Sequence, residues 1–74
     1  MEQLSVRVTT EYIKLDQLLK LAGLAASGAE AKYLIQDGNV SVNGGLSTRR
    51  GHKIRRGDAV LLRSGAEAFE IHVC

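Results

Sequence analysis

Two short helical patterns lie next to each other in the first half of this chain, and they constrain the fold more than any other feature. In residues 14–22 the apolar residues recur at positions i, i+3, i+4 and i+7, which places them on one helical face. Residues 28–37 contain a second apolar face, and a glycine suited to a left-handed cap follows each segment, at Gly23 and Gly38. Because only a few residues join the segments, the two helices must pack as a tight pair.

The start of the second helix is marked by a capping box. Ser27 and Glu30 form the Ser-x-x-Glu pattern, in which the side chains satisfy free amide groups of the first turn. Lys32 and Gln36 are four residues apart, so they share one face of the helix. We expect this face to point outward, away from the buried residues.

The remainder of the chain has the pattern of strands and tight turns. Alternation of polar and apolar residues, or a short apolar run, predicts strands at residues 3–9, 40–42, 59–62 and 69–73. Residues 43–45 (Asn-Gly-Gly) and 56–58 (Arg-Gly-Asp) are turn signals, because these residue types tolerate positive φ. The 74 residues leave room for one domain, residues 1–74, with the helix pair followed by mainly β structure.

Positive charge is concentrated in one part of the sequence. The net charge of the chain is only +2, yet residues 38–63 contain six basic side chains and one acidic side chain. A one-sided basic surface attracts polyanions even when the total charge is modest. The densest cluster is residues 49–56, Arg-Arg-Gly-His-Lys-Ile-Arg-Arg, which predicts contact with phosphate groups.

The sequence contains no sign of export or membrane insertion. Cys74 is the single cysteine, so no disulfide can form within the chain. No apolar run approaches the roughly 20 residues that span a bilayer. The N-terminus lacks the basic segment and apolar core of a signal peptide. We therefore expect a cytoplasmic protein.

The helices, turn and strand together resemble the S4 RNA-binding domain. The matching segments, within residues 13–63, are 14–19 (KLDQLL), 24–32 (LAASGAEAK), 34–44 (LIQDGNVSVNG) and 53–60 (KIRRGDAV). The resemblance implies an α+β fold with the αL motif, in which two packed N-terminal helices lie against a small, mainly antiparallel sheet. Residues 3–9 would add an N-terminal strand to this pattern. The chain looks most like stand-alone bacterial S4-like proteins.

The resemblance also implies a function and a set of contact residues. S4 domains bind structured RNA, such as ribosomal or transfer RNA, and carry no chemistry. We therefore expect a monomeric RNA-binding protein, with the ribosome as a candidate partner, and no enzyme. One departure is Gly28, where many S4 domains have a basic residue that contacts phosphate. The positions that match family contacts are Lys14, Ser27, Lys32 and Gln36 on the helices, and Asn43, Arg49, Arg50, His52 and Lys53 in the loop.

Other classes of protein fit the sequence less well. A protein-interaction module built on the helix pair is the main alternative. A ubiquitin-like sulfur carrier needs a free Gly-Gly C-terminus, whereas residues 72–74 are His-Val-Cys. A DNA-reading helix needs long polar side chains in its first half, and residues 28–31 do not supply them.

Tyr12 and Tyr33 are expected to pack in the core or at its rim rather than stack on bases.

The sequence also argues against catalysis and metal binding. Ser27, His52 and Asp58 are the residue types of a hydrolytic triad, but nothing in their positions brings them together. His52, His72 and Cys74 lack the spacing of metal ligands. We therefore expect no catalytic residue, no metal and no cofactor.

Overall fold

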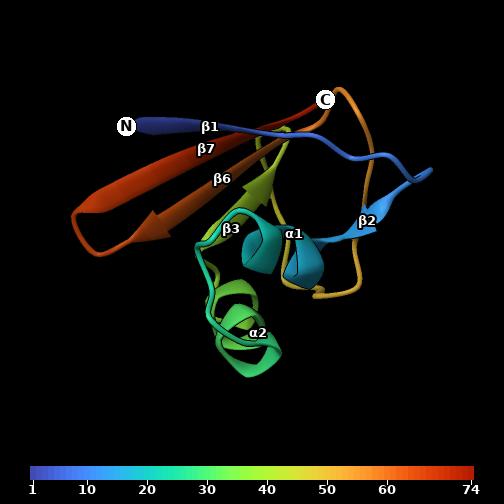
Figure 1. The fold of residues 1–74 in the computed structure, drawn as a ribbon. Coiled ribbons are helices and arrows are strands. Elements are labelled where there is room, and N and C mark those ends of the chain that lie inside the picture. The colour runs from blue at the N-terminus through green and yellow to red at the C-terminus, as the bar shows by residue number, and fades with distance from the viewer.

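The computed structural model describes residues 1–74 as two helices covering one face of a sheet (Figure 1). In chain order the elements are β1 (Glu2–Val6), β2 (Ile13–Lys14), α1 (Leu15–Leu21), α2 (Gly28–Gln36), β3 (Val40–Val42), β4 (Gly45–Leu46), β5 (Lys53–Ile54), β6 (Ala59–Ser64) and β7 (Glu67–Val73). Neither helix is long and apolar enough to cross a membrane.

Five of the strands form the main sheet, in the order β1-β7-β6-β3-β4, and β2 pairs with β5 in a separate two-stranded ribbon. All pairs are antiparallel except β1 with β7, which run parallel with Leu4 opposite Ile71. The first and last strands therefore lie side by side, blue and red in Figure 1. The predicted α+β fold, with its mainly antiparallel sheet and its added N-terminal strand, is confirmed.

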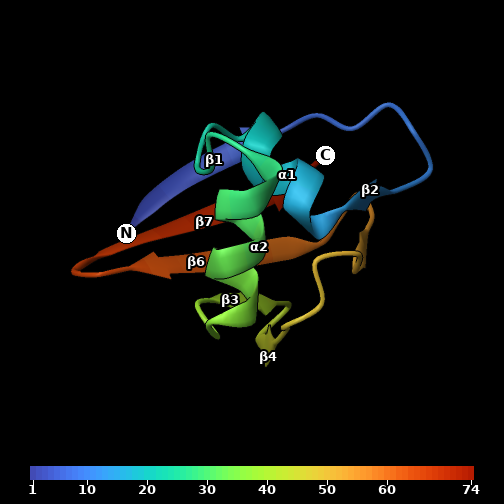
Figure 2. The ribbon, with the colours of Figure 1, turned by 90° about the horizontal axis from the view of Figure 1, so that it is seen from below.

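The core lies between the helix pair and the sheet. Figure 2 shows both helices over the same face of β6 and β7. Leu15, Leu18 and Leu19 of α1 are fully buried, as are Ala31 and Ile35 of α2. Each buried leucine or isoleucine contributes about 1.5–3 kcal/mol relative to an exposed one. The sheet supplies the opposite wall with Val40, Val60, Leu62 and Ile71.

Most element boundaries agree with the sequence prediction to within one or two residues, and two of the differences have a clear physical reason. The first helix begins at Leu15 and not at residue 14, because Lys14 has extended backbone and pairs in β2. The first strand ends at Val6 and not at residue 9. Val8 is nevertheless buried, and its N–H donates to the Cys74 carbonyl at 2.8 Å.

The tight turn after β3 forms as predicted. Asn43 and Gly44 both have positive φ, 50° and 87°, and they join Val42 to its partner Gly45. Two consecutive residues with positive φ make a two-residue hairpin turn whose twist matches that of the flanking strands. The turn joins β3 to β4, and the long basic loop follows β4.

Candidate nucleic-acid interface

The β2–β5 ribbon holds the basic loop against the start of α1. In the ribbon Ile13 lies opposite Ile54, and Lys14 lies opposite Lys53. The loop before β5 supplies carbonyl groups to α1: Leu15 N–H donates to His52 O at 2.9 Å, and Asp16 N–H donates to Arg50 O at 3.0 Å. Lys14 offers no side-chain cap, so these carbonyls satisfy the free amides of the helix.

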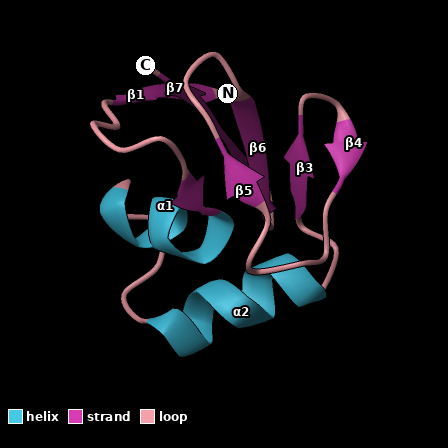
Figure 3. Ribbon diagram, turned by 90° about the vertical axis from the view of Figure 1, so that its right-hand side faces the viewer, coloured by secondary structure: helices cyan, strands magenta, loops and turns pink.

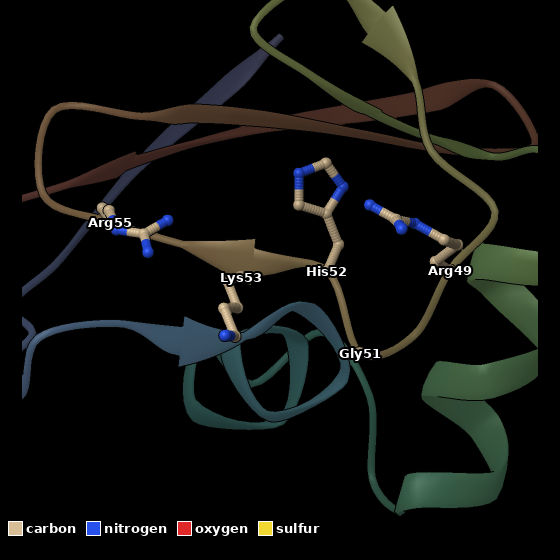
Figure 4. A pocket seen from close by; sticks show the side chains of 5 residues that line it. All are labelled: Arg49, Gly51, His52, Lys53 and Arg55. Atoms are coloured by element: carbon tan, nitrogen blue, oxygen red, sulfur yellow. The ribbon is translucent and has the colours of Figure 1, made fainter.

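Five of the predicted contact residues are therefore brought into one region: Lys14, Arg49, Arg50, His52 and Lys53, called here the basic surface. Three of these residues line an open hollow of about 470 Å³ (Figure 4), whose walls are Arg49, Gly51, His52, Lys53 and Arg55. No carboxylate and no apolar side chain lines this hollow. The lining is suited to an anion, because Arg49, Lys53 and Arg55 are positively charged and no negative charge opposes them there.

No acidic side chain forms a salt bridge with the basic surface. The single salt bridge of the molecule joins His72 Nε2 to Glu70 Oε1 at 3.0 Å, in β7. The arginines and lysines of the basic surface thus have no ion-pair partner within the chain. Unpaired cations that face one hollow are able to neutralise phosphates and release the counterions of a nucleic acid.

His52 is held in place by a serine that the sequence analysis did not single out. Ser47 is buried, with 6% of its surface exposed, and its Oγ lies 2.8 Å from His52 Nδ1. This bond leaves Nε2 without an intramolecular partner. Figure 4 shows the ring between Arg49 and Arg55. A serine and a histidine five residues apart do not by themselves predict a hydrogen bond, so the sequence analysis did not identify this pair.

The predicted contacts on α2 lie on a neighbouring surface. Ser27 Oγ accepts a hydrogen bond from Glu30 N–H at 3.2 Å, so the Ser27 half of the predicted capping box is confirmed. Lys32 and Gln36 are exposed, as their spacing indicated. No hydrogen bond joins these side chains to the basic loop, but Figures 2 and 3 show the β4–β5 loop running beside α2.

Asn43 differs from the other predicted contacts because both polar atoms of its side chain are bonded within the fold. Its Nδ2 donates to Asp58 Oδ1 at 3.0 Å, and its Oδ1 accepts from Ala59 N–H at 2.9 Å. Asp58 Oδ2 also accepts from Arg55 N–H at 2.7 Å. Together these bonds fasten the β3–β4 turn to the turn before β6, which supports the base of the basic loop.

The Asp58 contacts predict a specific pH dependence. The Arg55 N–H bond and then the Asn43 amide bond lower the pKa of the Asp58 carboxyl below its ordinary value. A lowered folded-state pKa stabilises the protein above the unfolded value, near pH 4, and this stabilisation is lost as pH falls through the folded value. Asp58→Asn should therefore be less stable than wild type at pH 7, and the difference should shrink below about pH 4.

Urea midpoints of wild type and Asp58→Asn, measured between pH 7 and pH 2, test this prediction. Other carboxyl groups titrate in both proteins, so their contributions cancel in the difference. A difference in unfolding free energy that stays constant down to pH 2 would show that the Asp58 charge does not contribute.

Arg56 belongs to the basic run in the sequence but not to the basic surface. Its Nη1 donates to the carbonyls of Val8 and Thr10, both at 2.9 Å. The guanidinium group therefore fastens the segment after β1 to the turn before β6. The sequence could not separate this structural arginine from its neighbours, because its acceptors are backbone carbonyls in a distant part of the chain.

One expectation about the tyrosines was wrong. Tyr33 does not pack in the core or at its rim, because 67% of its surface is exposed on α2. Its position lies between buried Ala31 and Ile35 in the sequence, but on the opposite face of the helix. Tyr12 is partly buried, and it lies beside Lys53 and Arg55.

The residue types of a hydrolytic triad do not meet. Ser27 caps α2, His52 bonds Ser47, and Asp58 bonds Asn43 and the Arg55 amide. No group of three histidine, cysteine or acidic side chains is placed to hold a metal ion. The geometry thus defines a small α+β protein that presents an uncompensated cationic surface on a loop and ribbon held by its helix pair.

This chain belongs to the S4 domain family, whose model matches residues 6–72. It is 38% identical over 66 residues to "Probable ribosome maturation protein RlbA" of Bacillus subtilis, covering 89% of this chain and 92% of that protein. It is 45% identical over 49 residues to YbcJ of Escherichia coli, covering 66% of this chain and 70% of YbcJ.

A solved structure agrees with the architecture. The solution structure of Escherichia coli YbcJ matches with a TM-score of 0.62 and 33% identity, over 97% of this chain and 87% of that one. That structure was described as revealing an αL motif involved in RNA binding. The helix pair and sheet of this protein therefore have the arrangement of a stand-alone S4 domain.

Proposed function

We propose that this protein binds structured RNA through the basic surface, with Ser27, Lys32 and Gln36 of α2 extending the contact. The observation that carries the proposal is the cluster of unpaired cations that the β2–β5 ribbon and the α1 start assemble around one hollow. Phosphate contacts from a rigid helix pair and loop suit folded RNA, which proteins recognise largely by shape and backbone. Asn43 is also a proposed RNA contact, and its bonds to Asp58 and Ala59 fix the turn that carries it.

The relatives favour RNA of the ribosome as the partner. RlbA carries the name of a ribosome maturation protein, and YbcJ was described as containing an RNA-binding motif. We infer that this protein associates with ribosomal RNA, acts as a monomer and contributes binding without chemistry. Crosslinking in cells, followed by sequencing of the bound RNA, would identify the partner directly.

Binding to a structured RNA should depend strongly on salt. If four or five cations of the basic surface and α2 neutralise phosphates, the slope of log affinity against log salt should be roughly −3 to −4. Titration of a hairpin RNA across a range of salt concentrations measures this slope, with a single strand and duplex DNA as controls. Salt-insensitive binding, or no preference for the hairpin over both controls, would contradict the proposal. No binding to any RNA would favour a protein partner.

A further inference from the structure

The outer face of the β2–β5 ribbon carries an aromatic ring among cations. Ile54 is fully buried and Ile13 packs against the core, so the residues that alternate with them face outward. Lys14 and Lys53 are direct partners in the ribbon. Tyr12 precedes β2 and Arg55 follows β5, which places an aromatic ring and a guanidinium group at the next position along the same face.

Contacts within this face confirm the grouping. Lys53 Nζ lies 4.9 Å from the centroid of the Tyr12 ring, and Arg55 Cζ lies 6.0 Å from it. Both distances fall within the reach of a cation–π interaction, the second at its outer limit of about 6 Å. The Tyr12 ring therefore contacts the Lys53 ammonium group, and the Arg55 guanidinium lies at the outer limit of such a contact.

The charges of the ribbon are not balanced within the molecule. Like charges directly opposite each other destabilise a pair of strands, and here Lys14 faces Lys53 in a ribbon of only two residues per strand. No carboxylate forms a salt bridge with either lysine or with Arg55, although the Asp58 carboxylate attracts Arg55 electrostatically. An anion bound at this face would relieve the repulsion, so the ribbon is built for an anionic ligand.

We propose that the ribbon face binds an unpaired nucleotide next to the folded part of the RNA. The base stacks on the Tyr12 ring, and the phosphates lie between Lys14 and Lys53. Cations interleaved with an aromatic ring are the combination that holds single-stranded nucleic acid. Paired bases in a helix do not expose their faces to a side chain, so the nucleotide must be unpaired. This inference rests on the proposed function and specifies the kind of RNA site, an unpaired nucleotide beside a folded segment.

Two hairpin RNAs that differ only in a single-stranded extension of three adenines test the proposal. The extension should tighten binding by between about 5-fold and 100-fold, the range that stacking of one base on an aromatic side chain supports. Tyr12→Leu should remove this gain. It should lower the affinity for the blunt hairpin by less than about 5-fold, because every cation of the basic surface is retained although Lys53 loses its contact with the ring. Tyr12→Phe, which keeps an aromatic ring, should retain the gain.

A second measurement keeps Tyr12 in place. The chain has two tyrosines and no tryptophan, so Tyr33→Phe leaves Tyr12 as the single strong fluorophore. Stacking of a base on its ring should quench the emission with the extended hairpin and not with the blunt one. The fluorescence measurement tests the proposal even if the Tyr12→Leu variant does not fold.

The outcomes separate this inference from the proposed function. Binding of both hairpins with equal affinity and equal emission would overturn the nucleotide site alone. An equal loss of affinity for both hairpins in Tyr12→Leu would also overturn it, because Tyr12 would then only position Lys53 and Arg55. Failure of both hairpins to bind wild type would remove the proposed function and this site with it.

Discussion

Replacing Arg49 and Arg50 together by alanine should weaken binding to a structured RNA by roughly 10- to 30-fold at 0.15 M salt, and flatten the salt slope by about 1–2 units. Each lost phosphate contact removes the counterion release that it drives. Both side chains are exposed and unpaired, so the fold should be nearly unaffected. The carbonyl of Arg50, which caps α1, is retained in alanine.

A matched control removes the same charge elsewhere. Arg7 follows β1, and Arg63 alternates with buried Leu62 in β6, on the sheet face away from the helices. Arg7→Ala with Arg63→Ala should leave the salt slope within about half a unit of wild type, since neither contacts the basic surface. If both double variants lose the same affinity, net charge alone governs binding and the basic surface is not the site.

Arg56→Ala should destabilise the fold by about 2–3 kcal/mol, since hydrogen bonds from charged groups each contribute about 1.5–3 kcal/mol and the released carbonyls regain some water. The loss should concentrate in the segment after β1, where Val8 and Thr10 would lose their shared donor. Urea midpoints measure the stability, and amide exchange of residues 8–12 locates the change.

Arg63→Ala is the control for Arg56→Ala, because it removes one exposed arginine that makes no side-chain hydrogen bond. A surface substitution of this kind should change the stability by no more than about 0.5 kcal/mol. Equal midpoints for the two variants would show that the bonds to Val8 and Thr10 contribute nothing to the folded state.

The helices were predictable because their signals are local. The leucine spacing of α1 and the Ser27 cap of α2 depend on residues within one or two turns of each other, and both glycine stops have the positive φ expected of them. The hairpin at Asn43 is local in the same sense. Family resemblance added the order of the elements, which residue spacing alone does not determine.

The β2–β5 ribbon could not be predicted from residue patterns. Two residues per strand are too few to show an alternation, and the partners lie far apart in the sequence. The same reason hides the roles of Tyr12, Arg55 and Arg56. In the sequence each of these residues resembles an ordinary surface residue, because its partners lie far away along the chain. Only the folded structure separates the basic residues that are free to contact a ligand from those that support the fold.

The parallel pairing of β1 with β7 has a consequence for how the chain acquires its structure during synthesis. β1 emerges first from the ribosome, but its partner is the last strand of the sheet. The helix pair depends on nearby residues and can form early, whereas β1 must wait, unpaired, until β7 follows. Pairings between such distant segments are slow to form. Folding should therefore be completed only after β7 has left the exit tunnel, and a nascent chain stalled before β7 would expose a free strand edge.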